Sequence, residues 1–103
     1  MADMNELLRQ AQEMQERLMA AQAESAETVV EGQAGGGLVK VTTTGAFDFR
    51  SVTIDPSAVD PDDVELLEDM VLAAVRDAVA RASEQAQQAM GQAGLGGLGG
   101  LLG

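Results

Sequence analysis

The sequence predicts an α+β fold: a long N-terminal helix, a three-stranded antiparallel meander and a long C-terminal helix. Apolar residues recur at helical spacing near both ends of the chain. β-Branched residues and glycines concentrate between these two patterns, and a Gly-rich segment follows the second. We therefore expect one domain over residues 1–90 and a flexible Gly/Leu-rich tail over residues 91–103.

The first helix is predicted from a narrow apolar seam with alternating spacings of three and four residues. The seam consists of Met4, Leu7, Ala11, Met14, Leu18 and Ala21. The residues between are mostly Gln, Glu and Arg, which favour helix and suit a solvated face. Ser25 interrupts the pattern, and we expect the helix to end or bend there.

Strands are predicted next, because residues 28–54 are rich in Val and Thr and are punctuated by glycines. Gly45 and Ala46 fit a two-residue type II′ hairpin turn, in which glycine supplies a positive φ. In the returning strand, Phe47 and Phe49 alternate out of phase with Val52 and Ile54. Either a bulge near residues 50–51 shifts the phase, or both faces of the strand are partly covered.

The second helix is predicted from a start signal and an apolar stripe. Asp60 is the expected N-cap, Pro61 the first helical residue, and two more acids follow near the positive end of the helix dipole. The stripe continues from Val64 to about Met90, and Ala dominates its second half. Small side chains favour close helix contact.

These lengths predict a homodimer. A three-stranded sheet is about 14 Å wide, whereas the helices are roughly 33 and 45 Å long, so their apolar seams project beyond the sheet. A twofold contact covers such surfaces with a single self-complementary interface. We expect the interface to contain Met14, Leu18, Val39, Val41, Phe47 and Phe49.

The amino-acid composition argues against an enzymatic function. The chain has no Cys and no His, which removes disulfides, the usual zinc sites, a thiol nucleophile and an imidazole base. Hydroxyls such as Ser51 and Ser57 have no base placed to activate them. The acids at 60–63 lack the Gly and Glu of a calcium loop, and the glycines at 32–37 precede a strand where a phosphate cradle needs a helix. We expect no catalytic residue, metal, cofactor or small-molecule substrate.

The compartment is also indicated by composition. No apolar run approaches the roughly 20 residues of a membrane span, and Asp3 and Glu6 stand where a signal peptide carries basic residues. We expect no membrane partner and a cytoplasmic location.

The formal net charge of −11 opposes indiscriminate binding to nucleic acid, so the placement of the six basic residues matters. Two lie in each predicted helix and two on the hairpin, and a dimer doubles the set. No aromatic residues interleave with them, which argues against recognition of single strands.

Four segments of the sequence carry a family resemblance: residues 8–16, 30–41, 51–56 and 59–69. They resemble the YbaB/EbfC family of bacterial nucleoid-associated proteins, and the match covers nearly the whole chain, including the closing Met/Gly-rich stretch. The resemblance implies an α+β homodimer whose helices project like tweezers around a shared sheet. It also implies a location on the nucleoid in the cytoplasm, and binding of double-stranded DNA without enzymatic activity.

Arg9, Arg17 and Lys40 align with basic positions of that family, and Arg50 precedes Ser51, where members often carry Lys. These four residues and Arg81 of the second helix are our five candidate DNA-binding residues. The chain departs from the family in having fewer lysines.

Two hypotheses follow. In the first, a dimer binds DNA phosphates with little readout of sequence. In the second, an acidic surface and a Leu-containing tail recruit a basic protein partner, and DNA binding is weak or lost.

Overall fold

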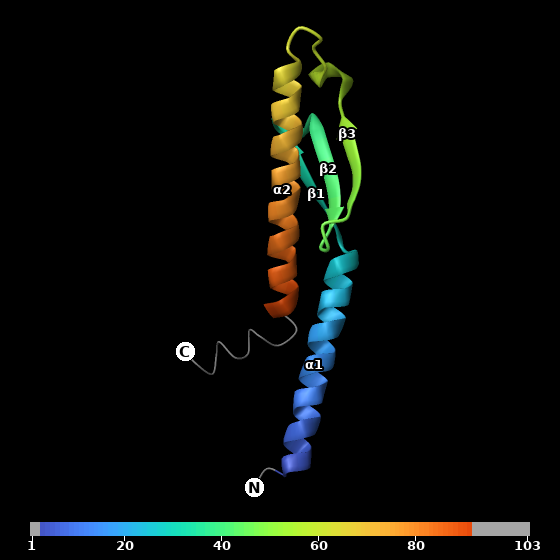
Figure 1. Ribbon diagram of the computed structural model, residues 1–103, viewed down its shortest axis with the longest axis vertical. Helices are drawn as coiled ribbons and strands as arrows, with labels where there is room; N and C mark the ends of the chain where they lie inside the picture. The colour runs from blue at the N-terminus through green and yellow to red at the C-terminus, as the bar shows by residue number, and fades with distance from the viewer. Residues whose placement is uncertain (1–2, 92–103) are drawn as a thin grey trace, which may run out of the picture.

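The computed structural model describes residues 3–91 and has the predicted α+β architecture (Figure 1). Its main elements, in chain order, are α1 (Met4–Glu27), β1 (Val29–Ala34), β2 (Val39–Thr44), β3 (Phe49–Ile54) and α2 (Val64–Met90). Short 3-10 turns occupy Gly35–Gly37 and Pro56–Ala58. The three strands form one antiparallel sheet in the order β1-β2-β3, so the predicted meander is confirmed. The predicted tail lies outside the described residues, apart from Gly91 at the end of α2.

The molecule is elongated because α1 extends away from the sheet as an arm. The principal extents are 74 × 27 × 15 Å and the radius of gyration is 20.0 Å, against about 13 Å for a compact chain of 100 residues. Only the C-terminal part of α1 lies beside α2 (Figure 1). The rest of the arm is exposed, including Met4, which retains 71% of its surface.

Of the two outcomes expected at Ser25, an end of the helix is wrong, because α1 continues past this residue. Ser25 is buried, and its hydroxyl donates a hydrogen bond of 2.9 Å to Oε1 of Gln85 in α2. The serine thus replaces an apolar seam residue with a polar contact between the two helices. The helix continues to Glu27, where the Thr28 backbone N–H and hydroxyl both donate to the carbonyl of Glu24.

The core lies between α2 and the sheet and is made of small side chains. Val39 and Val41 of β2 are 0% exposed and pack against Ala74 and Ala78 of α2. The prediction that both valines lie in the dimer interface is wrong. They belong instead to the core of a single chain, because α2 covers their face of the sheet, and they present no surface to a second copy.

Gly32 of β1 is the point of closest approach between strand and helix. A Cβ built there would overlap the backbone of α2, lying 2.5 Å from the carbonyl oxygen of Ala74 and 2.6 Å from Cα of Ala78. Only glycine on the strand, opposite alanine on the helix, allows this separation. As a result α2 sits over β1 and β2, and β3 is exposed along its whole length.

The hairpin differs from the predicted type II′ turn. Residues 45–47 form a three-residue loop in which Thr44 N–H donates to the carbonyl of Asp48, and Phe47, not Gly45, has a positive φ of 61°. Gly45 is needed for a different reason. A Cβ at this position would collide with the carbonyl of Ser25 at the end of α1.

A bulge at Arg50 resolves the phase of β3. Ile54 and Val52 pair with Val39 and Val41, but the register then shifts, so that Thr43 pairs with Phe49. Directly paired residues share a face of the sheet. Phe49, Val52 and Ile54 therefore all lie on the face that α2 covers over the neighbouring strands, and the bulge alternative is confirmed.

The N-cap of α2 is Asp63, not Asp60. The Asp63 carboxylate accepts a 3.3 Å hydrogen bond from Leu66 N–H, while Asp60 closes the preceding turn by accepting from Asp62 N–H. The residues predicted to start the helix therefore form two consecutive structures: Asp60 closes a turn, and Asp63 caps the helix.

Asp77 fastens the outer edge of the sheet to α2. Its carboxylate accepts hydrogen bonds from the backbone N–H of Gln33 in β1, at 2.9 Å, and from Nε of Arg81, at 3.0 Å. The bond from the Gln33 N–H, and then that from Arg81, lower the pKa of Asp77 below its ordinary value of 3.8. One backbone N–H of the β1 edge is thus bonded to a side chain of α2, whereas β3 forms the opposite edge.

Replacing Gly32 by Ala should destabilise the fold by about 2–3 kcal/mol, because the added methyl group overpacks a backbone-to-backbone contact. Urea denaturation measures the loss. Gly91→Ala is the matched control, since a Cβ at Gly91 meets no described atom within 4 Å. Equal stability of the two variants would contradict the contact.

Replacing Asp77 by Asn should lower the urea midpoint at pH 7. A carboxylate whose folded pKa is depressed stabilises the fold above its unfolded pKa, and this contribution is lost as pH falls through the folded value. The gap between native and variant midpoints should therefore shrink below pH 3.8. Asp69→Asn, on an exposed position of α2, is the control; the same pH dependence in both variants would refute the assignment to Asp77.

Candidate nucleic-acid interface

The five candidate cations do not form one cluster. Arg9 and Arg17 lie on the α1 arm, Lys40 and Arg50 lie on the sheet, and Arg81 lies on α2. All five are exposed. A ligand that contacts the whole set must therefore be extended, as a nucleic-acid duplex is.

Lys40 lies on the face of the sheet opposite α2, which we call the open face. It pairs with Gln33 of β1 and Thr53 of β3, so these three side chains share that face. One step along, Thr42 pairs with Ser51, and their hydroxyl oxygens are 2.6 Å apart. The open face thus offers an ammonium group, hydroxyls and an amide, which are donors for phosphate oxygens, but Glu31 pairs with Thr42 and adds a carboxylate to the same face.

Two of the five cations already have acidic partners. Arg50 Nε lies 2.8 Å from Oδ2 of Asp48, and Arg81 Nε lies 3.0 Å from Oδ2 of Asp77. Exposed pairs of this kind contribute only about 0–1 kcal/mol each, so a phosphate can displace them. Within residues 3–91, Arg9, Arg17 and Lys40 have no acidic partner within ion-pair distance, which leaves their charge available.

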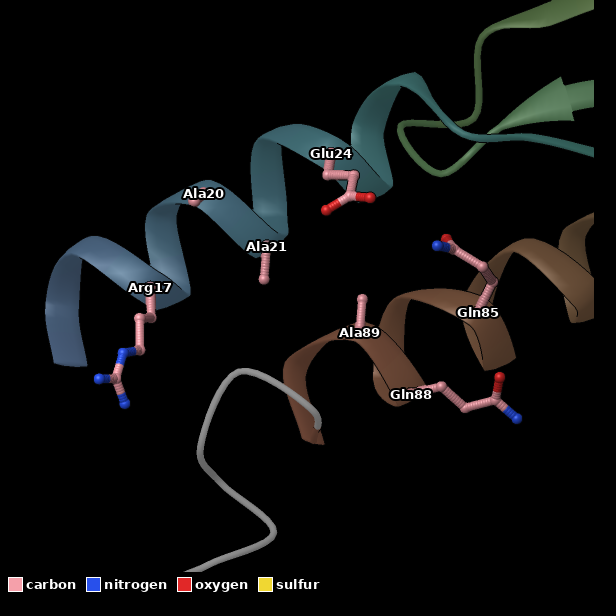
Figure 2. A pocket seen from close by; sticks show the side chains of 7 residues that line it. All are labelled: Arg17, Ala20, Ala21, Glu24, Gln85, Gln88 and Ala89. Carbon is pink, nitrogen blue, oxygen red and sulfur yellow. The ribbon is translucent and has the colours of Figure 1, made fainter.

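Arg17 also borders a cleft between α1 and the C-terminal turns of α2, shown in Figure 2. The cleft has a volume of about 440 Å³ and is lined by Arg17, Ala20, Ala21, Glu24, Gln85, Gln88 and Ala89. Ala21 and Ala89 point toward each other across it. Small apolar and amide side chains dominate this lining, and no hydroxyl or thiol nucleophile is among its described residues.

The described part of the chain contains no group of three or more His, Cys, Asp or Glu residues arranged to hold a metal ion. Neither of its two helices is long and apolar enough to cross a membrane.

An uncovered apolar surface, which we call the β3 face, lies on the other side of the sheet from Lys40. Phe49, Val52 and Ile54 remain 46%, 54% and 37% exposed there. Asp77 lies on the side of α2 that contacts β1, and the buried alanines of α2 come next around the helix. The residues on the far side of these alanines therefore flank β3. They are Leu72, Val75 and Val79, and the first and last of them are exposed.

The β3 face was only partly visible in the sequence. Phe47 and Phe49, which the sequence predicts in the dimer interface, are 47% and 46% exposed. Val52 and Ile54 were missed because the phase mismatch in the sequence left two explanations open, and only the bulge brings them beside Phe49. Met14 and Leu18 are half-buried on the arm, away from the β3 face.

The comparisons with known proteins agree with this architecture. The model of the YbaB/EbfC DNA-binding family matches residues 1–98. A protein of Nocardia farcinica named nucleoid-associated protein is 58% identical over 84 residues, which are 82% of this chain and 76% of the relative. Proteins of the same name from Rhodococcus opacus and Streptomyces griseus are each 56% identical over 82% of this chain, and the match covers 74% and 71% of their lengths.

A crystal structure of an uncharacterized protein from Helicobacter pylori has a similar fold, with a TM-score of 0.64 at 20% sequence identity. The match covers 85% of this chain and 92% of that one. The family match spans the helices and the sheet on which the candidate cations lie, and the named relatives align over most of the same residues. The chain belongs to the YbaB/EbfC DNA-binding family.

Proposed function

We propose that this protein binds double-stranded DNA as a homodimer, through contacts to backbone phosphates and with little readout of sequence. The observation that carries the proposal is the exposure of Arg9, Arg17 and Lys40 without acidic partners within the described residues. Lys40 is supported by the hydroxyls of the open face. The named relatives are nucleoid-associated proteins, and we infer the same location, on the nucleoid in the cytoplasm, for this chain.

Phosphate contact without sequence readout is favoured by the types of residue available. Reading base edges requires side chains that enter a groove on a helix or a ribbon. The open face of the sheet instead presents short hydroxyls, one lysine and one glutamate, Glu31. The arginines of α1 are spaced eight residues, or about 12 Å, apart along an exposed helix. Such a surface follows the backbone of a duplex and makes few contacts with bases.

The homodimer is supported by the β3 face. Its apolar side chains adjoin the edge strand of the sheet, and an uncovered edge of this kind pairs readily with another strand. A twofold axis beside β3 would join two sheets and bury both β3 faces together. At the other edge of the sheet, the backbone N–H of Gln33 is already bonded to Asp77 of α2, so we assign the dimer contact to the β3 edge.

Charge sets the strength of binding. Two chains carry 12 basic and 34 acidic residues, twice the counts of one chain. Attraction therefore depends on the local grouping of cations, and salt should weaken it steeply. A family member with this balance is expected to bind DNA at low salt and release it readily as salt rises.

Replacing Lys40 by Gln should weaken DNA binding and flatten its salt dependence. Each phosphate contact contributes about 0.9 to the slope of log K against log salt, so losing one contact per subunit should reduce the slope by about 1.8. Fluorescence anisotropy with a labelled duplex at several salt concentrations measures this. Arg9→Gln and Arg17→Gln should act in the same way.

Arg76→Gln is the matched control, because Arg76 is an exposed arginine of α2 outside the candidate set and its loss changes net charge equally. An equal effect of Arg76→Gln and Lys40→Gln would show that total charge, not the open face, governs binding. Binding that is indifferent to salt would contradict phosphate contact altogether.

Replacing Val52 by Asp should dissociate the homodimer, since an unpaired carboxylate would be buried at the centre of the interface. A cost of several kcal/mol raises the dissociation constant more than about 100-fold. Analytical ultracentrifugation measures the change. Leu66→Asp is the control, because Leu66 is 52% exposed but lies three helical turns before Asp77, on the β1 side of α2.

A native chain that sediments as a folded monomer at micromolar concentration would disprove the homodimer. If that monomer still bound DNA, the proposed phosphate contacts would stand, and only the proposed dimer would be wrong.

A further inference from the structure

The α1 arm joins the rest of the fold near its C-terminal end. Residues 4–13 are all exposed, whereas Ser25 is the one buried residue of α1 and keeps 5% of its surface accessible. From this end the arm extends away from the sheet (Figure 1). Ser25 contacts Gly45 of the hairpin loop and Gln85 of α2, and we call these three residues the arm junction.

The hairpin loop contacts the arm backbone to backbone. A Cβ built on Gly45 would collide with the carbonyl of Ser25 and lie 2.8 Å from its Oγ, so only glycine allows this approach. The N–H of Gly45 also donates a hydrogen bond of 3.2 Å to the carbonyl of Thr28, the C-cap of α1. Gly45 directly follows β2, so these contacts tie the arm to the strand that carries Lys40.

The contact with α2 is a hydrogen bond. The Ser25 hydroxyl donates to Oε1 of Gln85 at 2.9 Å, and a hydrogen bond is directional in a way that contact between methyl groups is not. One turn further along each helix, Ala21 and Ala89 face each other across the cleft of about 440 Å³ (Figure 2). The cleft leaves space into which the arm can tilt, so the bond to Gln85 limits that tilt.

The length of the arm makes its direction matter for the candidate cations. Arg9 and Arg17 precede Ser25 by 16 and eight residues, or about 24 and 12 Å along the helix. A tilt of about 10° at the arm junction moves Arg9 by about 4 Å and Arg17 by about 2 Å relative to the sheet. A hydrogen bond from a guanidinium to a phosphate spans only about 2.7–2.9 Å. Such a tilt therefore decides whether the arm reaches the same duplex as Lys40.

We infer that Ser25, Gly45 and Gln85 are positioning residues for DNA binding. They hold the α1 arm at the angle at which its two arginines and the open face of the sheet contact one duplex together. The inference rests on the proposed function. None of the three residues is charged, so they act on binding through the direction of the arm.

Spin labels on engineered cysteines measure that direction without DNA, because the chain has no native Cys. One label is placed on the arm through Gln12→Cys and one on α2 through Asp69→Cys, both at exposed positions. Labelled chains are mixed with an excess of unlabelled native chain, so that both labels of a pair lie in one subunit. Pulsed dipolar spectroscopy then gives the distribution of distances between arm and α2.

Removing either partner of the hydrogen bond, by Ser25→Ala or by Gln85→Ala, should widen this distribution about twofold, because small rotations at the arm junction become large displacements along the arm. Gln88→Ala is the matched control, since Gln88 is an exposed glutamine that lines the same cleft. A distribution that is as narrow in Ser25→Ala and Gln85→Ala as in Gln88→Ala would overturn the inference.

DNA binding provides the second readout, by fluorescence anisotropy at low salt on the unlabelled full chain. Ser25→Ala should weaken binding about three- to tenfold, because a freely tilting arm must be ordered on the duplex. The change should also reduce the effect of Arg9→Gln, which lies on the arm, and leave the effect of Lys40→Gln, on the sheet, intact. A general loss of stability would not separate these two cations.

The failure of the positioning role and the failure of the proposed function give different results. A native chain without salt-dependent DNA binding would disprove the proposed function and the positioning role with it. If the native chain binds DNA and Ser25→Ala binds it equally well, only the positioning role is wrong.

Discussion

The close contact between Gly32 and the α2 backbone determines which surfaces of this fold are covered. Because β1 has no side chain at that position and α2 presents Ala74 and Ala78, helix and strand meet backbone to backbone. The helix is thereby drawn to the β1 side of the sheet. Asp77 fixes it there through the Gln33 N–H, and every residue of β3 stays exposed.

This placement leaves a core too small for the apolar content of the chain. The largest fully buried side chains among the described residues are those of valine and threonine, while Phe49, Val52 and Met4 remain in solvent. Burial of apolar area is the main favourable contribution to folding, so small cores are marginal and commonly gain stability by association. The β3 face and the α1 seam are where this chain has further area to bury.

The sequence predicted what local periodicity encodes. The seam of α1, the Val and Thr content of the strands and the alanine stripe of α2 predicted each element in order, and a resemblance over most of the chain predicted the family. Features that depend on distant contacts were missed. Gly45 resembles a turn glycine, yet its neighbour is Ser25, and nothing near Val39 in the sequence shows that α2 covers it.

The candidate site was predictable only as a set of residue types, because pairing is a property of three-dimensional distance. Arg81 and Lys40 are equally basic in the sequence, but one lies 3.0 Å from a carboxylate oxygen and the other faces hydroxyls. Net charge conceals this difference. Coulomb attraction to phosphate is screened over about 8–10 Å, so the charges within that radius of Lys40 matter more than the total of −11. Glu31 shares the open face with Lys40, and Glu13 lies four residues from both Arg9 and Arg17 on α1, so attraction to phosphate depends on how the cations are grouped in the assembled protein.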